Sequence, residues 1–292
     1  MIRRPPRSTL SPSSAASDVY KRQPVYYPLD KTIIQGTTYQ TPRDIGYLVL
    51  KIGTDGSTDT KLVVDGKPTG AITSDFAPMI KSSSNLLGPL PLGELYYVVP
   101  PDTKFWVDGP SGAKMRLVGK IVKLVTGESF PGDLMARFDK QFDEYITYIS
   151  DSYSLGTDVD WTDGTEYDIL VHTPKTIEKI VLDSVVMAKI ENFATDPGYG
   201  AVGIRFKLDG DPLDILTDEP GMRGVDYKYM PYPPTPTAGE IPFTLAPYPI
   251  TVEGDHTLTI TAINDSGSSL SPSSGASITV TVLAVIKYFR KR

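Results

Sequence analysis

Apolar and polar residues alternate over most of this chain, the pattern of strands with one buried face. The segment 201–208 shows it most clearly, with large apolar residues at 202, 204, 206 and 208 and with Arg205 and Lys207 between them. The same pattern predicts strands at 46–52, 61–64, 95–99, 104–107, 113–124, 167–172, 177–190, 257–263 and 277–289. The sequence therefore predicts a mainly β protein built from antiparallel strands.

Two finer expectations follow from this pattern. The polar, glycine-containing turn 53–57 lies between the strands 46–52 and 61–64, which predicts that these two strands form a hairpin. The strand 257–263 is expected to turn its threonines outward.

The segment 129–150 departs from alternation. Its apolar residues, among them Leu134, Phe138 and Ile149, recur at steps of three and four, as on one face of a helix. Ser129 can cap such a helix, and Pro131 is tolerated in a first turn. We therefore expect one amphipathic helix over 129–150, packed against at least one of two sheet domains that it joins.

A chain of 292 residues is long enough for two domains that each bury a core. The expected fold is two antiparallel β-sandwich domains of jelly-roll-like form, joined by the helix. The expected boundaries are an unfolded 1–22, an extended arm 23–44, a first sandwich 45–126, a helical connector with an acidic loop 127–166, and a second sandwich 167–292 with a Tyr/Pro-rich loop 218–249.

The two halves share a short pattern. Leu62–Pro68 and Phe206–Pro212 both end an alternating strand with Asp-Gly and reach proline two residues later. This agrees with a duplicated sandwich, and it agrees equally with the general preference of tight turns for Asp-Gly.

Composition narrows the classes of function. The chain has no cysteine, which excludes thiol catalysis and cysteine-ligated metal. Its net charge of −6 argues against a general nucleic-acid binder, because such proteins need cationic side chains to neutralise phosphates. No run of about 18 apolar residues is present, so no membrane-spanning helix is expected.

The first 22 residues, MIRRPPRSTLSPSSAASDVYKR, are basic and rich in serine and proline. They resemble the conceptual translation of a sequencing-library adapter, and a disordered basic tail is the other interpretation. The segment carries five Lys and Arg residues and one Asp, a net charge of +4, which leaves −10 for the rest. If the adapter interpretation holds, the true N-terminus and any targeting signal are missing.

The acidic loop 158–168 is the best candidate for metal binding, because clustered carboxylates are the oxygen ligands that calcium prefers. Asp158, Asp160 and Asp163 are the candidate ligands, although the spacing does not match a helix-loop-helix calcium site. A solvated acidic linker is the alternative. The same carboxylates could also supply the acid pair of a glycoside hydrolase, but the sequence gives no distance between them.

Other catalytic patterns are weak. His172 and His256 are the only imidazoles, and they fall in separate strands without a Gly-x-Ser-x-Gly nucleophile turn. The segment 198–203 imitates a glycine-rich dinucleotide fingerprint, but it leads into a strand instead of a helix. We therefore expect no enzymatic activity.

Aromatic residues are the more unusual feature. Proline stiffens extended loops, and tyrosine offers broad contact area at low entropy cost, so the Tyr/Pro-rich loop is suited to contact with a partner or glycan, or to packing on its own domain. The candidate contact residues are Tyr26, Tyr27, Trp106, Tyr227, Tyr229, Tyr232 and Tyr248.

The arm, the tandem sandwiches, the Thr-rich strands and the lack of catalytic groups together resemble the structural proteins of virus particles. The resemblance is one of style and rests on no family motif. It implies a non-enzymatic capsid, tail or spike component that assembles with copies of itself or other coat proteins, located in the virion or outside the cell. The alternative is a carbohydrate-binding or adhesin module, and glycoside hydrolase is a weaker one.

Overall fold

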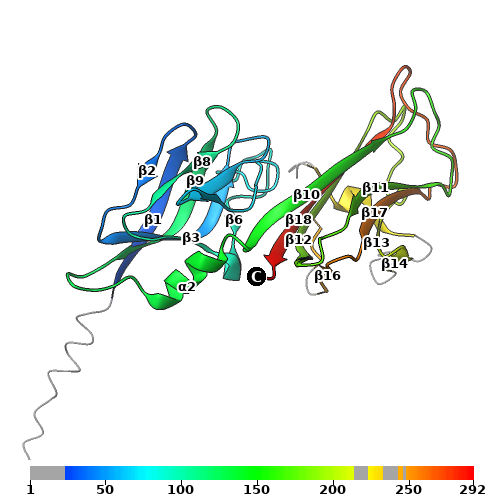
Figure 1. Cartoon of the computed structure of the whole chain (residues 1–292). Helices are drawn as coiled ribbons and strands as arrows, with labels where there is room; N and C mark the ends of the chain where they lie inside the picture. The colour runs from blue at the N-terminus through cyan, green and yellow to red at the C-terminus, as the bar shows by residue number, and fades with distance from the viewer. Residues whose placement is uncertain (1–23, 214–222, 233–242, 246–247) are drawn as a thin grey trace, which may run out of the picture.

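The computed structural model describes residues 24–213, 223–232, 243–245 and 248–292, and it forms two antiparallel β-sandwiches with one α-helix between them in the chain (Figure 1). The expected mainly β fold with two sandwich domains is confirmed. The segment 1–22 and parts of the loop 218–249 lie outside the described residues.

The first sandwich pairs a five-stranded sheet with a four-stranded sheet. The larger has the order β1-β9-β3-β6, with β7 also on β3, and the smaller has the order β2-β8-β4-β5. The bounds are β1 Val25–Ile34, β2 Tyr39–Gln40, β3 Ile45–Thr54, β4 Lys61–Val64, β5 Lys67–Pro68, β6 Leu90–Pro91, β7 Tyr97–Val99, β8 Lys104–Asp108 and β9 Lys114–Lys123, with a short 3₁₀ helix, η1, at Gly93–Leu95.

The second sandwich is built in the same way. One sheet has the order β10-β18-β12-β16, and the other has the order β11-β17-β13-β14, with β15 also on β13. The bounds are β10 Glu144–Ser154, β11 Glu166–His172, β12 Glu178–Glu191, β13 Val202–Leu208, β14 Asp211–Pro212, β15 Val225–Asp226, β16 Ile250–Glu253, β17 Leu258–Asn264 and β18 Thr279–Arg290, with a 3₁₀ helix, η3, at Tyr227–Tyr229.

The two sandwiches have one topology. If β10 to β14 are matched with β1 to β5, and β16 to β18 with β7 to β9, every pairing among these eight strands has its counterpart in the other sandwich. The short strands β6 and β15 are not equivalent, because β6 pairs with β3 whereas β15 pairs with β13. Eight strands in this order form a jelly roll. The sequence match noted above lies at equivalent hairpins, where Asp65 and Asp209 both have a positive φ, 50° and 52°, and each is followed by a glycine of positive φ. The shared sequence pattern therefore corresponds to the same type of turn at equivalent positions in the two sandwiches.

The expected helix over 129–150 is wrong beyond residue 140. Helix α2 spans Gly132–Lys140, and β10 then begins at Glu144 and pairs with β18 along its full length. Residues 145–149, Tyr-Ile-Thr-Tyr-Ile, are aromatic or β-branched and favour a strand once a partner strand is present. Helix α2 packs Leu134 against Val98 and Val122 on the outer face of the first sandwich.

One other expectation is wrong, and two need detail. Strands β3 and β4 form no hairpin, because they lie in different sheets of the first sandwich. Thr259 and Thr261 lie on the outer face, as expected, because Leu258, Ile260 and Ala262 between and beside them face the core, but both threonines are buried, with 8% and 0% exposure. Thr261 lies opposite Arg205 in the sheet, and an ion pair between Arg205 and Glu166 crosses this face, so longer side chains cover the threonine. The segment expected to be an extended arm contains β1, which pairs with β9 over all ten of its residues.

The sheet β10-β18-β12-β16 is buried on both faces along part of its central strand β18 and of its neighbours. On β18, Val282, Ala284 and Ile286 belong to the core of the second sandwich, whereas Leu283 and Val285 belong to the cluster that fills the first. Met187 of β12 and Ile146 of β10 join the same cluster. The two sandwiches are therefore packed side by side through apolar contacts, with the C-terminus near their junction (Figure 1).

Candidate functional site

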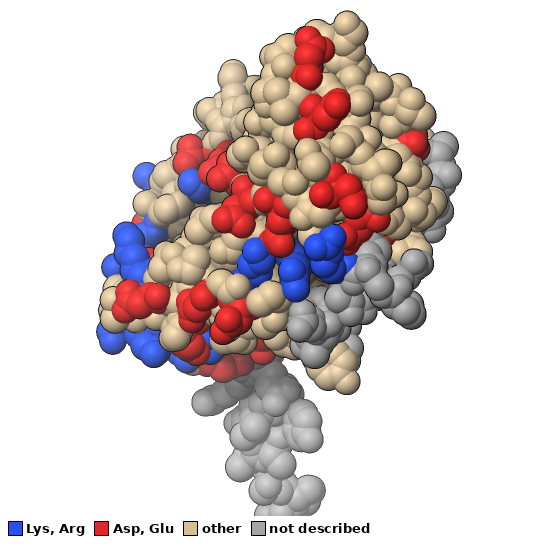
Figure 2. Space-filling model, turned by 90° about the vertical axis from the view of Figure 1, so that its right-hand side faces the viewer, with Lys and Arg blue, Asp and Glu red and all other residues tan. Residues whose placement is uncertain are grey.

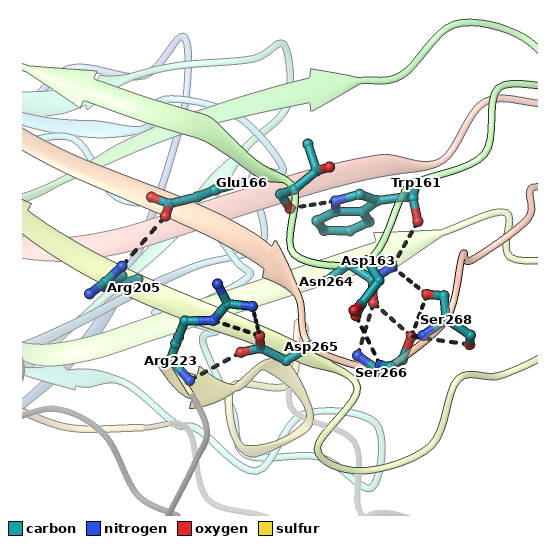
Figure 3. Close-up of polar contacts among 11 residues, drawn as sticks. Trp161, Asp163, Glu166, Arg205, Arg223, Asn264, Asp265, Ser266 and Ser268 are labelled. Atoms are coloured by element: carbon teal, nitrogen blue, oxygen red, sulfur yellow. Dashed lines mark hydrogen bonds and ion pairs between the residues drawn. The ribbon is translucent and has the colours of Figure 1, made fainter.

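The acidic loop between β10 and β11 is anchored by a buried tryptophan. Trp161 is fully buried, donates from its indole nitrogen to Thr165 O at 2.9 Å, and exchanges two backbone hydrogen bonds with Leu270 (Figure 3). Asn264, also fully buried, donates its amide to Trp161 O at 2.7 Å and to Ser268 O at 2.8 Å. The loop is therefore fastened to the β17–β18 connection at several points.

Two of the three candidate calcium ligands take part in this fastening. Asp163 accepts a hydrogen bond from Gly267 N at 2.9 Å, and Asp158 accepts one from Gly275 N at 2.7 Å. Asp160 is exposed beside them. Within the described ranges, no three His, Asp or Glu side chains lie close enough together to hold a metal ion. The carboxylates that suggested calcium have a role in joining two loops, and calcium binding stays a prediction.

The outer face of the second sandwich carries ion pairs rather than a free charged patch. Glu166 lies between Arg205, at 3.6 Å, and Lys207, with which it also pairs. At the edge of this face the Arg223 guanidinium lies 2.6 Å from Asp265. On the side shown in Figure 2, Lys and Arg lie in a central band and along the left edge, with Asp and Glu next to both groups, while the top of the view carries acidic residues. Such a face does not offer the uncompensated positive charge that a polyanion needs.

The predicted aromatic contact residues separate into two groups. Tyr232 is half-buried and donates to Asp75 of the first sandwich at 2.8 Å, while Trp106 and Tyr227 are partly buried in their own domains. The exposed group consists of Tyr26 (48%), Tyr27 (49%), Tyr229 (38%) and Tyr248 (71%). Sequence reasoning missed Tyr199, which is 61% exposed and whose ring centroid lies 5.8 Å from that of Tyr229. In the sequence, the two glycines that flank Tyr199, Gly198 and Gly200, were the only indication of an unusual loop at this position.

Strand β1 forms an edge of the first sandwich. It pairs with β9 on one side, and no described strand pairs with its other side. Four of its large apolar side chains are exposed, namely Val25, Tyr26, Tyr27 and Ile34. Such an edge is a template for association with another chain, because its backbone groups on the open side have no strand partner.

The two histidines lie apart. Asp209 contacts the imidazole of His256 at 2.6 Å and also accepts from Thr257 N at 2.8 Å, so this pair joins the turn between β13 and β14 to the one before β17. The Asp209 carboxylate raises the pKa of His256. His172 lines a pocket of about 360 Å³ with Asp59, Tyr148 and Asp151 at the junction, and burial lowers its pKa. Neither imidazole meets the acids of the 158–168 loop.

The longest helix among the described residues has nine residues, too short to cross a bilayer.

Comparisons with known proteins give distant similarities. No protein-family profile matches the sequence, and no curated protein matches it. Among solved structures, the chain is similar to the major capsid protein of bacteriophage PM2, with 10% identity, a TM-score of 0.30, and coverage of 92% of this chain and 99% of that one. It is also similar to a conserved protein of unknown function from Pseudomonas aeruginosa, with 8% identity, a TM-score of 0.20, and coverage of 89% and 79%. A third similar structure is a turret protein of Sulfolobus turreted icosahedral virus, with 11% identity, a TM-score of 0.17, and coverage of 90% and 98%. At these TM-scores none of the three carries a functional argument.

Proposed function

We propose that this chain is a structural component of a virus particle that assembles with copies of itself. The proposal rests on the open edge of β1. A strand of ten residues that pairs on one side only, and that exposes four large apolar side chains, is an association surface by the ordinary rules for β-sheets. The partner of this surface is a second copy of the chain.

The tandem architecture supports the same function. Jelly rolls occur in viral coats, and also in lectins and cupins, so one jelly roll alone would not separate these classes. Here two jelly rolls of one topology are packed through the doubly buried sheet β10-β18-β12-β16. The equivalent sheet of the first sandwich has α2 on one part of its outer face and the edge strand β1 beside it. The two packed jelly rolls form one rigid unit, and the sheet of the first sandwich keeps an edge strand, β1, with no described strand on its outer side. A rigid unit with such an edge is suited to repeated assembly with copies of itself.

The candidate catalytic groups have other contacts. His256 and Asp209 join two turns, and the carboxylates Asp158 and Asp163 join two loops. A non-enzymatic role agrees with these assignments, and the virion or the extracellular space is the location that the proposal implies.

Multi-angle light scattering on the purified full chain tests the proposal. We expect an oligomer of one defined mass whose population rises with protein concentration. Tyr26→Asp and Tyr27→Asp, placed together on β1, should shift the chain to monomer because they put two charges into the apolar contact. Tyr199→Ala, a change at an exposed tyrosine of the other sandwich, is the matched control and should assemble normally. A wild-type monomer at all concentrations would contradict the proposal.

A further inference from the structure

Tyr199 stands at the tip of a loop whose backbone is held in place. It lies between Gly198 and Gly200, which have φ angles of 82° and 77° that residues with a Cβ rarely adopt. The carboxylate of Asp226, 2% exposed, accepts hydrogen bonds from Gly200 N and from Lys228 N. A buried carboxylate thus fixes the two segments that carry Tyr199 and Tyr229, although both tyrosines remain substantially exposed.

A lysine packs against the rings of Tyr199 and Tyr227. The Lys228 ammonium is 5.0 Å from the centroid of the Tyr199 ring and 5.9 Å from that of Tyr227, and its side chain is only 16% exposed. It is held by Asp196 Oδ1 at 2.7 Å. The same oxygen accepts from Gly198 N at 3.0 Å, so within the described part of the chain Asp196 Oδ2 has no recorded hydrogen bond. The Lys228 ammonium also lowers the pKa of Asp196, which keeps the carboxylate ionised.

We propose that Tyr199, Tyr229, Lys228 and Asp196 form a binding site for a neutral sugar ring of a glycan. The Tyr199 and Tyr229 rings, with their centroids 5.8 Å apart and their planes at 43°, receive the C–H face of a pyranose. Asp196, with 72% of its side chain exposed, accepts from the ring hydroxyls in charge-assisted hydrogen bonds.

Charge and geometry favour a sugar over a peptide. The Lys228–Asp196 pair is neutral as a whole, so the surface does not select a charged ligand by simple attraction. A pyranose combines an apolar face with a polar hydroxyl rim, and the surface likewise places exposed rings next to an exposed acceptor. The loop is fixed before binding, so little entropy is lost when the tyrosines engage.

A glycan array probed with the labelled full chain tests the site, followed by saturation-transfer NMR with each free oligosaccharide that binds. We expect the wild-type chain to bind at least one glycan with a neutral pyranose at its end. Tyr199→Ala should weaken that binding about tenfold, the equivalent of one ring contact. Asp196→Asn should weaken it as well. Both variants should remain folded, with at most a small fall in melting temperature, because Tyr199 packs over Lys228 and Asp196 pairs with it.

Tyr248→Ala is the matched control, since Tyr248 is 71% exposed and is not part of the site. It should bind like the wild type. Binding to no glycan on the array overturns the proposal, and so does wild-type affinity in Tyr199→Ala. A protein partner whose capture depends on Tyr199, in the absence of any glycan binding, would identify a protein-docking surface and overturn it equally. The result is independent of assembly, because Tyr26→Asp/Tyr27→Asp should leave glycan binding intact.

Discussion

Tyr232 of the second sandwich donates its phenolic proton to Asp75 of the first, with 2.8 Å between Oη and Oδ2. The two residues are 157 positions apart in the chain. Tyr148 of β10 makes a similar bond to Asp59. Two tyrosine–carboxylate bonds therefore lie beside the apolar contacts that join the sandwiches, and they give the junction a defined register as well as a buried area.

Replacing Tyr232 with phenylalanine removes one of these bonds and keeps the ring. We expect the free energy of unfolding to fall by about 1 kcal/mol, which corresponds to a loss of roughly 2 °C in melting temperature for a chain of this size. Urea denaturation and calorimetry measure both quantities. Tyr248→Phe, at an exposed position, should change neither, and an unchanged Tyr232→Phe variant would show that the bond contributes nothing to stability.

Gly70 is a stricter test of the junction. A Cβ at this position would lie 1.9 Å from Ile146 O of β10, so the turn after β5 could not keep its contact with the second sandwich. Gly70→Ala should lower the free energy of unfolding by about 3 kcal/mol or more, as expected for overpacking against backbone. Gly132→Ala, at the start of α2 where a Cβ would meet nothing within 4 Å, is the control and should be close to neutral. Equal stability of the two variants would disprove the close packing.

The carboxylate of Asp163 should stabilise the acidic loop in the absence of any metal. Asp163→Ala removes the acceptor for Gly267 N, and we expect a loss of about 1 to 2 kcal/mol in buffer containing a chelator. Thermal melts with and without millimolar calcium chloride then test the calcium prediction. A rise in the melting temperature of the wild type that disappears in Asp163→Ala would show that the loop also holds the ion. Asp160→Ala is the comparison, because Asp160, unlike Asp163, accepts no hydrogen bond from the described residues.

The two histidines should titrate on opposite sides of the usual imidazole pKa. Asp209 raises the pKa of His256, and burial lowers that of His172. With only two imidazoles in the chain, NMR titration resolves both directly. If His256 titrated at or below the usual value, the pairing with Asp209 would be refuted.

The consequences for stability have opposite signs. The protonated His256 is favoured in the folded chain, so its contribution is complete below the unfolded imidazole pKa of about 6.5 and is lost as the pH rises through the raised folded value. The pKa of Asp209 is lowered by His256, so the pair is also lost as the pH falls through that lower value.

For His172 the neutral form is favoured in the folded chain. Its contribution to stability is therefore complete above about pH 6.5 and declines as the pH falls. His172→Gln should therefore reduce the loss of stability between about pH 6.5 and pH 5, whereas His256→Gln should remove the loss of stability that accompanies a rise in pH above about 6.5.

Alternation predicted the strands well because each has one face against a core, as β13 shows with Val202, Ile204 and Phe206 all fully buried. The long helix was wrong because apolar residues at steps of three and four in 129–150 belong to two elements in succession. Leu134 and Phe138 lie on α2, whereas Ile146 and Ile149 lie on β10 and face different clusters. The first half of β10 carries apolar residues on both faces, because one face packs on each cluster, so alternation with polar residues is absent there.

The candidate sites were harder to predict. In a sequence, a loop carboxylate that binds a metal cannot be distinguished from one that accepts a hydrogen bond from a backbone amide. Asp158 and Asp163 accept such bonds from glycines more than a hundred residues away, and these contacts exist only in the folded chain. Tyr199 was missed because an exposed aromatic residue leaves no periodic pattern. Its loop is defined by the positive φ angles of Gly198 and Gly200 and by the hydrogen bond from Gly200 N to the buried Asp226, a contact between residues 26 positions apart in the chain.

The consecutive residues of β18 that point into two different interiors bear on how the chain unfolds. Removing the first sandwich would leave Leu283 and Val285 bare to water on a strand that the second sandwich needs, so neither half has a self-sufficient native state. Heat should melt both sandwiches in one calorimetric transition, and a substitution at Ala284 or Val285 should lower the stability of both.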